Sequence, residues 1–78
     1  FDATISKSRF TVTADFGALA AKKKISFVVE NTATGAVVTY VRRANATGVA
    51  SYTIGRKGTF EIYAMLGEEL TDSVVVKR

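Results

Sequence analysis

Apolar and polar residues alternate with a period of two along most of this chain, which is the pattern of β-strands rather than of helices. The clearest run is Lys24 to Glu30, in which Ile25, Phe27 and Val29 fall on one face. Val, Ile, Thr, Phe and Tyr dominate such runs, and Gly or Asn residues separate them. We therefore predict an all-β chain.

About six to seven short strands are expected, joined by loops too brief for parallel crossovers, which indicates an antiparallel sandwich or a small barrel. The segment from Asp15 to Ala21 is predicted to be a loop with one turn, because it is too short for a self-supporting helix. The predicted strands are Arg9 to Ala14, with an earlier start near Thr4 broken around Lys7, then Lys24 to Glu30, Ala36 to Arg43, Val49 to Ile54, Thr59 to Ala64 and Leu70 to Lys77.

The strand from Ala36 to Arg43 has two possible facings. Either Val37, Thr39 and Val41 point inward, or Val38 and Tyr40 do; we favour the second, which leaves Arg42 to extend past the rim of the core. The full predicted core is Phe10, Val12, Ile25, Phe27, Val29, Tyr40, Tyr52, Ile54, Phe60, Ile62, Ala64 and Val74.

The chain of 78 residues is long enough for one domain, and its start at Phe1 suggests a domain excised from a larger protein or a processed chain. With no Cys and no His, it lacks disulfides and the residues most often used for catalysis at neutral pH. We therefore expect a non-enzymatic domain with no catalytic residue, no cofactor and no metal site. Apolar runs such as Val74 to Val76 fall far below the roughly 18 residues of a membrane span, so no membrane insertion is expected.

The net charge of +4 favours encounters with anionic polymers, and the basic residues come in groups. If the strands alternate in direction, Lys22 to Lys24 and Arg42-Arg43 share one end of the sandwich, where Glu68 and Glu69 partly neutralise them. Such an end could bind nucleic acid, an anionic polysaccharide or a capsid neighbour, or it could simply be solvated. Aromatic residues are not interleaved with these cations, which favours the solvated end over nucleic-acid recognition. The candidate surface contacts are Lys22, Lys23, Lys24, Arg42, Arg43 and Tyr63.

Three blocks in the second half of the chain carry a family resemblance: Thr47 to Ile54, Lys57 to Ala64, and Ser73 to Lys77. Their order and spacing resemble the bacterial immunoglobulin-like domains of the invasin and intimin kind. The likeness covers Lys23 to Lys77, but the turn from Asn31 to Gly35 lacks the proline usual in that family. The resemblance implies an immunoglobulin-like β-sandwich and carries over no catalytic residue.

Similar domains occur as stacked spacers in bacterial adhesins and as exposed parts of tailed-bacteriophage capsid-decoration and tail proteins. The resemblance therefore implies surface display or host attachment on a virion, through weak multivalent contact with the host cell surface. The expected partners are virion or cell-surface proteins reached through a flanking domain, and an anionic bacterial surface polysaccharide. The alternatives are a stalk or adhesion repeat of a bacterial cell-surface adhesin, and a polysaccharide-binding module that uses the basic end.

Overall fold

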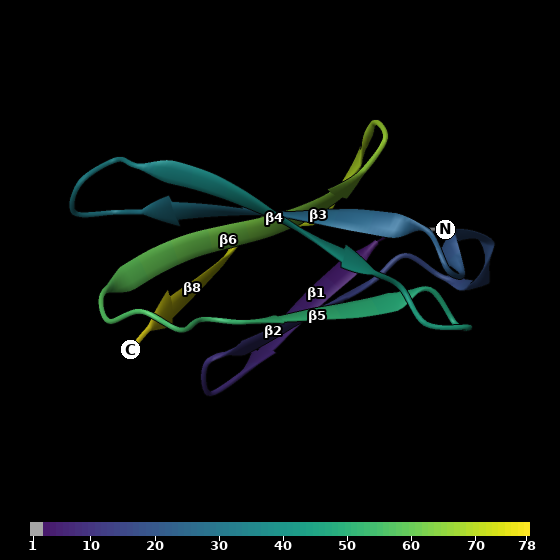
Figure 1. Cartoon of the computed structure of the whole chain (residues 1–78), viewed down its shortest axis with the longest axis horizontal. Coiled ribbons are helices and arrows are strands. Elements are labelled where there is room, and N and C mark those ends of the chain that lie inside the picture. Colours follow the sequence, from purple (N-terminus) through teal and green to yellow (C-terminus); the bar gives the residue numbers. More distant parts are fainter. Residues whose placement is uncertain (1–2) are drawn as a thin grey trace.

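The computed structural model describes residues 3–78, and over this range the chain forms eight β-strands and one 3-10 helix (Figure 1). The all-β prediction is confirmed, because that helix has only three residues. The elements are β1 (Thr4–Ser8), β2 (Thr11–Asp15), η1 (Ala18–Ala20), β3 (Lys24–Asn31), β4 (Val37–Arg43), β5 (Val49–Thr53), β6 (Thr59–Leu66), β7 (Glu69–Leu70) and β8 (Val74–Lys77).

Two antiparallel sheets pack against each other, as the two layers of Figure 1 show. The three-stranded sheet has the order β1-β2-β5. The five-stranded sheet has the order β4-β3-β6-β7, and β8 also pairs with β6. Every paired strand in these sheets runs antiparallel to its neighbour. The predicted antiparallel sandwich is therefore correct, although it is built from more strands than the sequence pattern indicated.

The core lies between the sheets and consists of the inward side chains that the alternation predicts. Phe27, Ile25 and Ile62 have no exposed surface, as expected for the central strands of the wider sheet. Among the predicted core residues, Phe10, Tyr40 and Val74 are only partly buried. The prediction did not include six other buried apolar residues, namely Ala14, Phe16, Ala20, Ala44, Ala50 and Val76.

The first predicted strand is in fact two strands. The chain reverses at Arg9, whose positive φ of 54° forms the turn, and β1 then pairs along β2 with Lys7 opposite Val12. The predicted break at Lys7 therefore lies at the Arg9 turn instead. Alternation cannot reveal this turn, because no Gly or Asn marks it.

The last predicted strand is also divided. Met65 and Leu66, expected in a turn, complete β6, and the turn follows at Gly67. Thr71 then ends β7, because its Oγ1 accepts a hydrogen bond from the Ala64 N–H at 3.0 Å and donates one to the Asp72 carbonyl at 2.9 Å. In β8, Val76 is 1% exposed while Val74, at the start of the strand, stays half-buried.

Strand β4 lies at the edge of the wider sheet, and its facing agrees with the favoured prediction. The Tyr40 ring stacks on Tyr52 with centroids 4.6 Å apart, whereas Val37 and Val41 point outward and are 56% and 50% exposed. Val38 shares the inward facing of Tyr40 and is nevertheless 38% exposed. Val38 lies next to the β3–β4 turn at the start of β4, whereas Tyr40 lies further along the strand, over β5.

Candidate functional site

The cations predicted to meet at one end of the sandwich do so. Lys24 begins β3 and pairs with Arg43, the last residue of β4, and both side chains are exposed. Ile25, the residue after Lys24, is buried, so the alternation places Lys24 on the outer side of the five-stranded sheet. The prediction that the groups Lys22 to Lys24 and Arg42-Arg43 share an end is confirmed by this register.

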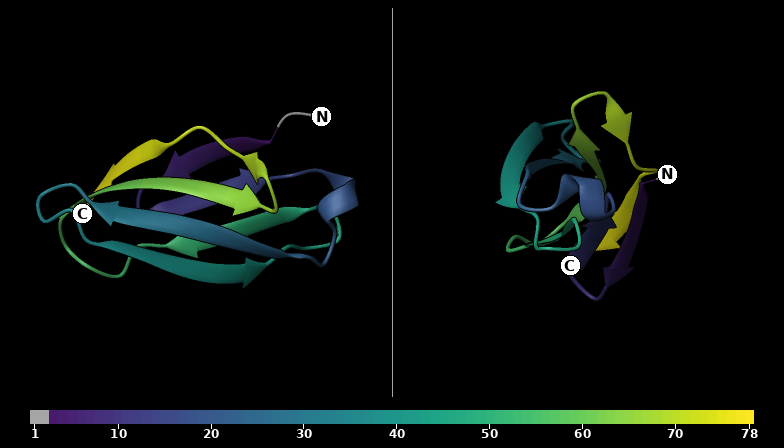
Figure 2. Two further views of the ribbon diagram at one scale, coloured as in Figure 1. Left: turned by 90° about the horizontal axis from the view of Figure 1, so that it is seen from above. Right: turned by 90° about the vertical axis from the view of Figure 1, so that its right-hand side faces the viewer.

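Lys22 and Lys23 lie in the segment between η1 and β3, which is tied by backbone hydrogen bonds to the β4–β5 turn. The Lys22 N–H donates to the Asn45 carbonyl at 3.2 Å, and the Ala44 N–H donates to the Lys23 carbonyl at 2.8 Å. Figure 2 shows these segments together at the end of the molecule that carries η1. The backbone beneath the two lysines is therefore held in place, while their side chains remain exposed.

Arg42 points to the other side of β4 from Arg43 and covers an aromatic pair. Its guanidinium carbon lies 5.9 Å from the Tyr40 ring centroid and 5.3 Å from that of Tyr52. This is the rim position that the favoured facing predicted, and the contact adds cation–π attraction to the stack. Burial raises the pKa of the Tyr52 hydroxyl above 10.0, and the neighbouring Tyr40 raises it further.

Glu68 and Glu69 lie at the same end, as expected, and Asp15 lies there as well. The three carboxylates have different surroundings. The Asp15 Oδ1 accepts a hydrogen bond from the Gly17 N–H at 2.9 Å and so holds the loop before η1. Glu68 is exposed in the β6–β7 turn, whereas Glu69 lines a pocket together with Lys23. The expected partial neutralisation of the cations is therefore consistent with the position of Glu69.

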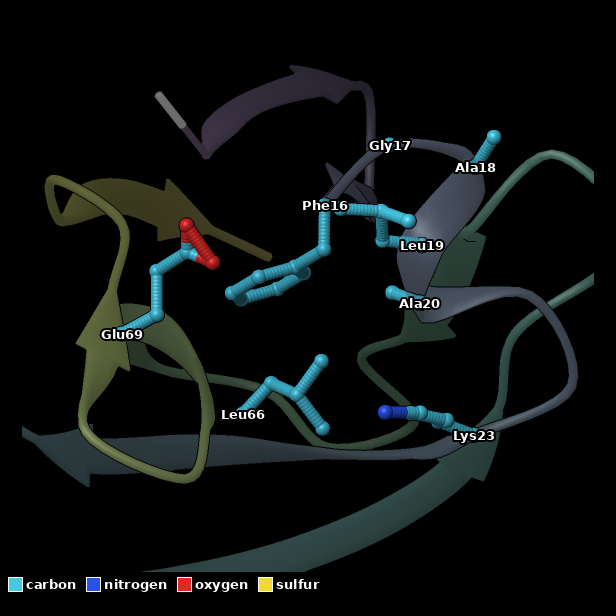
Figure 3. A pocket seen from close by; sticks show the side chains of 8 residues that line it. All are labelled: Phe16, Gly17, Ala18, Leu19, Ala20, Lys23, Leu66 and Glu69. Carbon is cyan, nitrogen blue, oxygen red and sulfur yellow. The ribbon is translucent and has the colours of Figure 1, made fainter. Parts of the chain in front are cut away.

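That pocket has a volume of about 270 Å³ and opens at the cationic end. Figure 3 shows Lys23 and Glu69 on opposite walls, with the Phe16 ring and the Leu66 side chain between them. Sequence reasoning missed this site. The signal for it was the apolar content of the segment from Asp15 to Ala21, which was interpreted only as a loop. The lining residues are Phe16, Gly17, Ala18, Leu19, Ala20, Lys23, Leu66 and Glu69.

Tyr63 lies away from the cationic end, in the middle of the outer face of the five-stranded sheet. It stands on β6 opposite Val28 of β3, and both side chains are half-buried. We use "outer face" for the side chains of this sheet that point away from the core. Lys24, Arg43 and Tyr63 share the outer face, whereas Lys22, Lys23 and Arg42 do not lie on it.

The site offers charge, apolar surface and aromatic rings, but no cluster suited to a metal. Among residues 3–78, no three His, Cys, Asp or Glu side chains come together where they could hold an ion. In the same part of the chain, no helix is long and apolar enough to cross a membrane. The chemistry available at the cationic end is therefore electrostatic attraction, hydrogen bonding and apolar contact.

Comparisons with protein families, with curated proteins and with solved structures each find no match to this chain.

Proposed function

We propose that this chain is a non-enzymatic display and attachment domain that presents its cationic end to an anionic polymer of a host cell surface. The observation that carries the proposal is the meeting of Lys22, Lys23 and Lys24 with Arg43 on backbone segments joined by hydrogen bonds. Cations held on a firm backbone attract a polyanion without a deep pocket, because the attraction acts over several ångströms.

The setting that we propose is the surface of a virion, in a capsid-decoration or tail protein. This part of the proposal is supported by the resemblance to bacterial immunoglobulin-like domains, whose three blocks lie on β5, β6 and β8. A cluster of a few exposed cations binds weakly by itself. Many copies on one particle raise the overall affinity by about 10² to 10⁴, because later contacts form at high effective concentration.

The test compares single and multiple copies of the domain binding to an anionic bacterial surface polysaccharide. We expect millimolar binding by the isolated domain, and binding at least a hundredfold tighter by nanoparticles that carry many copies. Replacing Lys22, Lys23 and Lys24 together by Ala should abolish the binding of the particles, and added salt should weaken the binding of the wild type.

A matched control removes three cations from the opposite end, namely Arg9, Arg56 and Lys57. Both variants lose the same charge, so a loss confined to the first identifies the cationic end rather than net charge. If the two variants lose polysaccharide binding equally, the binding depends only on net charge, and the proposal is contradicted. Nanomolar binding by the isolated domain would contradict the multivalent mechanism.

A second candidate, a spacer repeat in the stalk of a bacterial adhesin, is supported by the positions of the chain ends. Thr4 pairs with Asp15 at the cationic end, whereas Lys77 pairs with Thr59 at the opposite end. Copies joined in tandem would therefore extend along the 35 Å long axis. Small-angle scattering on two linked copies should show the longest dimension growing by about 35 Å, and a folded-back pair of unchanged length would exclude the spacer.

A further inference from the structure

The outer faces of the two sheets differ sharply in polarity. On the three-stranded sheet, hydroxyl side chains face outward and bond across the strands, with Thr11 to Thr53 at 3.0 Å and Thr13 to Ser51 at 3.2 Å. On the five-stranded sheet, the outer face carries seven apolar side chains: Val28, Val37, Val41, Tyr63, Met65, Leu70 and Val75.

Four of these apolar residues are about half open to solvent. Val37, Val41, Leu70 and Val75 are between 48% and 57% exposed, and they lie on three strands, namely β4, the short β7 and β8. An antiparallel sheet with one face on the core normally places polar residues on the other face, as the three-stranded sheet does. A broad apolar face on a small soluble domain is typical of a protein contact.

Four charged residues of the outer face form two rows across the strands, and a fifth, Lys77, lies outside both rows at the end of β8, opposite Thr59. Lys24 stands beside Arg43 in a cationic row, and Glu30 stands beside Glu61 in an acidic row. Both rows include β3, with Ser26 and Val28 between them on the same face. Two glutamates directly opposite each other repel, so the acidic row is stabilised by any cation brought over it.

We propose that two copies of this chain associate through the outer faces of their five-stranded sheets. The two-fold axis lies between the sheets and crosses β3 between Ser26 and Val28. The axis is tilted slightly from the perpendicular to β3, so that it exchanges Lys24 with Glu61 and Arg43 with Glu30. The cationic row of each copy then lies over the acidic row of the other. Ser26, Val28, Tyr63 and Met65 fill the centre of the contact.

The self-complementary order of charges is what identifies the occupant as a second copy. A two-fold contact brings the same surface of both copies together, so a partly charged surface must carry opposite charges at positions that the axis exchanges. On the outer face, one two-fold axis is enough to place the cationic row of each copy over the acidic row of the other. A surface of one charge would instead indicate a different partner of opposite charge.

The size of the face suits a weak dimer. Strand β3 has eight residues, so at about 3.3 Å per residue the face is about 26 Å long, and β4, β3, β6 and β8 side by side span about 19 Å. The footprint is therefore about 500 Å² per copy, which lies at the low end for specific interfaces. We expect a dissociation constant in the micromolar range, about 10 to 100 µM.

Lys22, Lys23 and Arg42 lie off the outer face and remain accessible in this dimer. Because the axis runs across the strands, the two cationic ends point in opposite directions. Lys24 and Arg43 take part in both proposals, but the dimer depends on their pairing with Glu30 and Glu61, whereas the attachment also uses Lys22 and Lys23. Each proposal can therefore fail without the other.

The experiment is sedimentation velocity on wild-type protein and on two charge-reversed variants. One variant carries Lys24→Glu with Arg43→Glu, and the other carries Glu30→Lys with Glu61→Lys. Each variant alone should be monomeric at about 100 µM, a concentration where the wild type dimerises. An equimolar mixture of the two should dimerise again, because both contacts between rows then join opposite charges.

Two further variants separate this contact from general charge attraction. Arg56→Glu with Lys57→Glu makes the same charge change at the far end of the sandwich, and it should dimerise like the wild type. Tyr63→Ala removes the central aromatic ring and should weaken dimerisation at least tenfold, with an unchanged far-UV circular dichroism spectrum showing that the fold is intact.

Three outcomes would overturn the proposal. The first is a wild-type protein that stays monomeric at 1 mM. The second is a charge-reversed variant that still dimerises on its own. The third concerns the Arg56→Glu, Lys57→Glu variant. The proposal fails if this variant loses the dimer, or if it pairs with the Glu30→Lys, Glu61→Lys variant as readily as the Lys24→Glu, Arg43→Glu variant does.

Discussion

Gly48→Ala tests how the loops of the cationic end are held together. Gly48 has φ 82°, and a Cβ added there would lie 1.7 Å from the Gly17 carbonyl oxygen. The left-handed conformation alone costs an L-residue about 1–2 kcal/mol. The clash must also push the two loops apart, which breaks the bonds between them from the Phe16 N–H to the Gly48 carbonyl, at 3.0 Å, and from the Lys22 N–H to the Asn45 carbonyl, at 3.2 Å.

At about 1 kcal/mol for each lost hydrogen bond, the total cost of Gly48→Ala is about 3–4 kcal/mol. A domain of 78 residues has a free energy of unfolding of about 4–12 kcal/mol, so the substitution should remove between about a quarter and all of the stability. Urea unfolding followed by circular dichroism at 25 °C measures the change. The midpoint urea concentration of the variant should be lower than that of the wild type.

Alanine substitutions at two other glycines separate the conformational cost of a positive φ from the cost of the steric clash. Gly35 has φ 74° with open space around it, so Gly35→Ala should cost only the conformational part, about 1–2 kcal/mol. Gly55 has open space and no positive φ, so Gly55→Ala should leave the stability unchanged or raise it by up to about 1 kcal/mol. If Gly48→Ala costs no more than Gly35→Ala, the close approach of the two loops is refuted.

Three further predictions concern the core, the β4–β5 turn and the aromatic pair. Phe27→Ala should cost about 3–5 kcal/mol in urea unfolding, because its ring is fully buried. Asn45→Ala should cost about 1–2 kcal/mol and Asn45→Asp much less, since Oδ1 accepts bonds from the Thr47 N–H, the Thr47 hydroxyl and the Val49 N–H. Above pH 10.0 the folded chain keeps the Tyr52 proton that the unfolded chain loses, so stability should fall as pH rises. The difference between wild-type and Tyr52→Phe absorbance titrations at 295 nm should show this late ionisation; a midpoint at or below pH 10.0 would contradict the burial.

The positions of most strands could be predicted because their inward residues alternate with polar ones. Ile25, Phe27 and Val29 on β3, and Phe60, Ile62 and Ala64 on β6, are buried as the period of two requires. The two terminal strands were predicted less well. Arg9 turns the chain without a turn-forming residue, and Thr71 ends β7 through a side-chain hydrogen bond to a residue seven positions earlier.

Part of the candidate site could also be predicted, because antiparallel neighbours place the start of one strand beside the end of the next. That rule brought Lys24 and Arg43 together correctly. It could not show that Arg42 covers the Tyr40–Tyr52 stack, that Lys23 and Glu69 face each other across a pocket, or that Tyr63 lies far from the cations. Each of these depends on contacts between elements distant in the sequence.

The sequence by itself determined that the chain is a β-protein with an apolar interior, because the period of side chains along a strand is a local property. Only the tertiary structure decided which strands are neighbours and which sheet is wider. The apolar outer face follows from those two facts, since Val37, Val41 and Val75 become one surface only when β4, β3, β6 and β8 lie side by side. Strand pairing is set by the packing of the whole chain, and for that reason the surface cannot be recognised from any single segment.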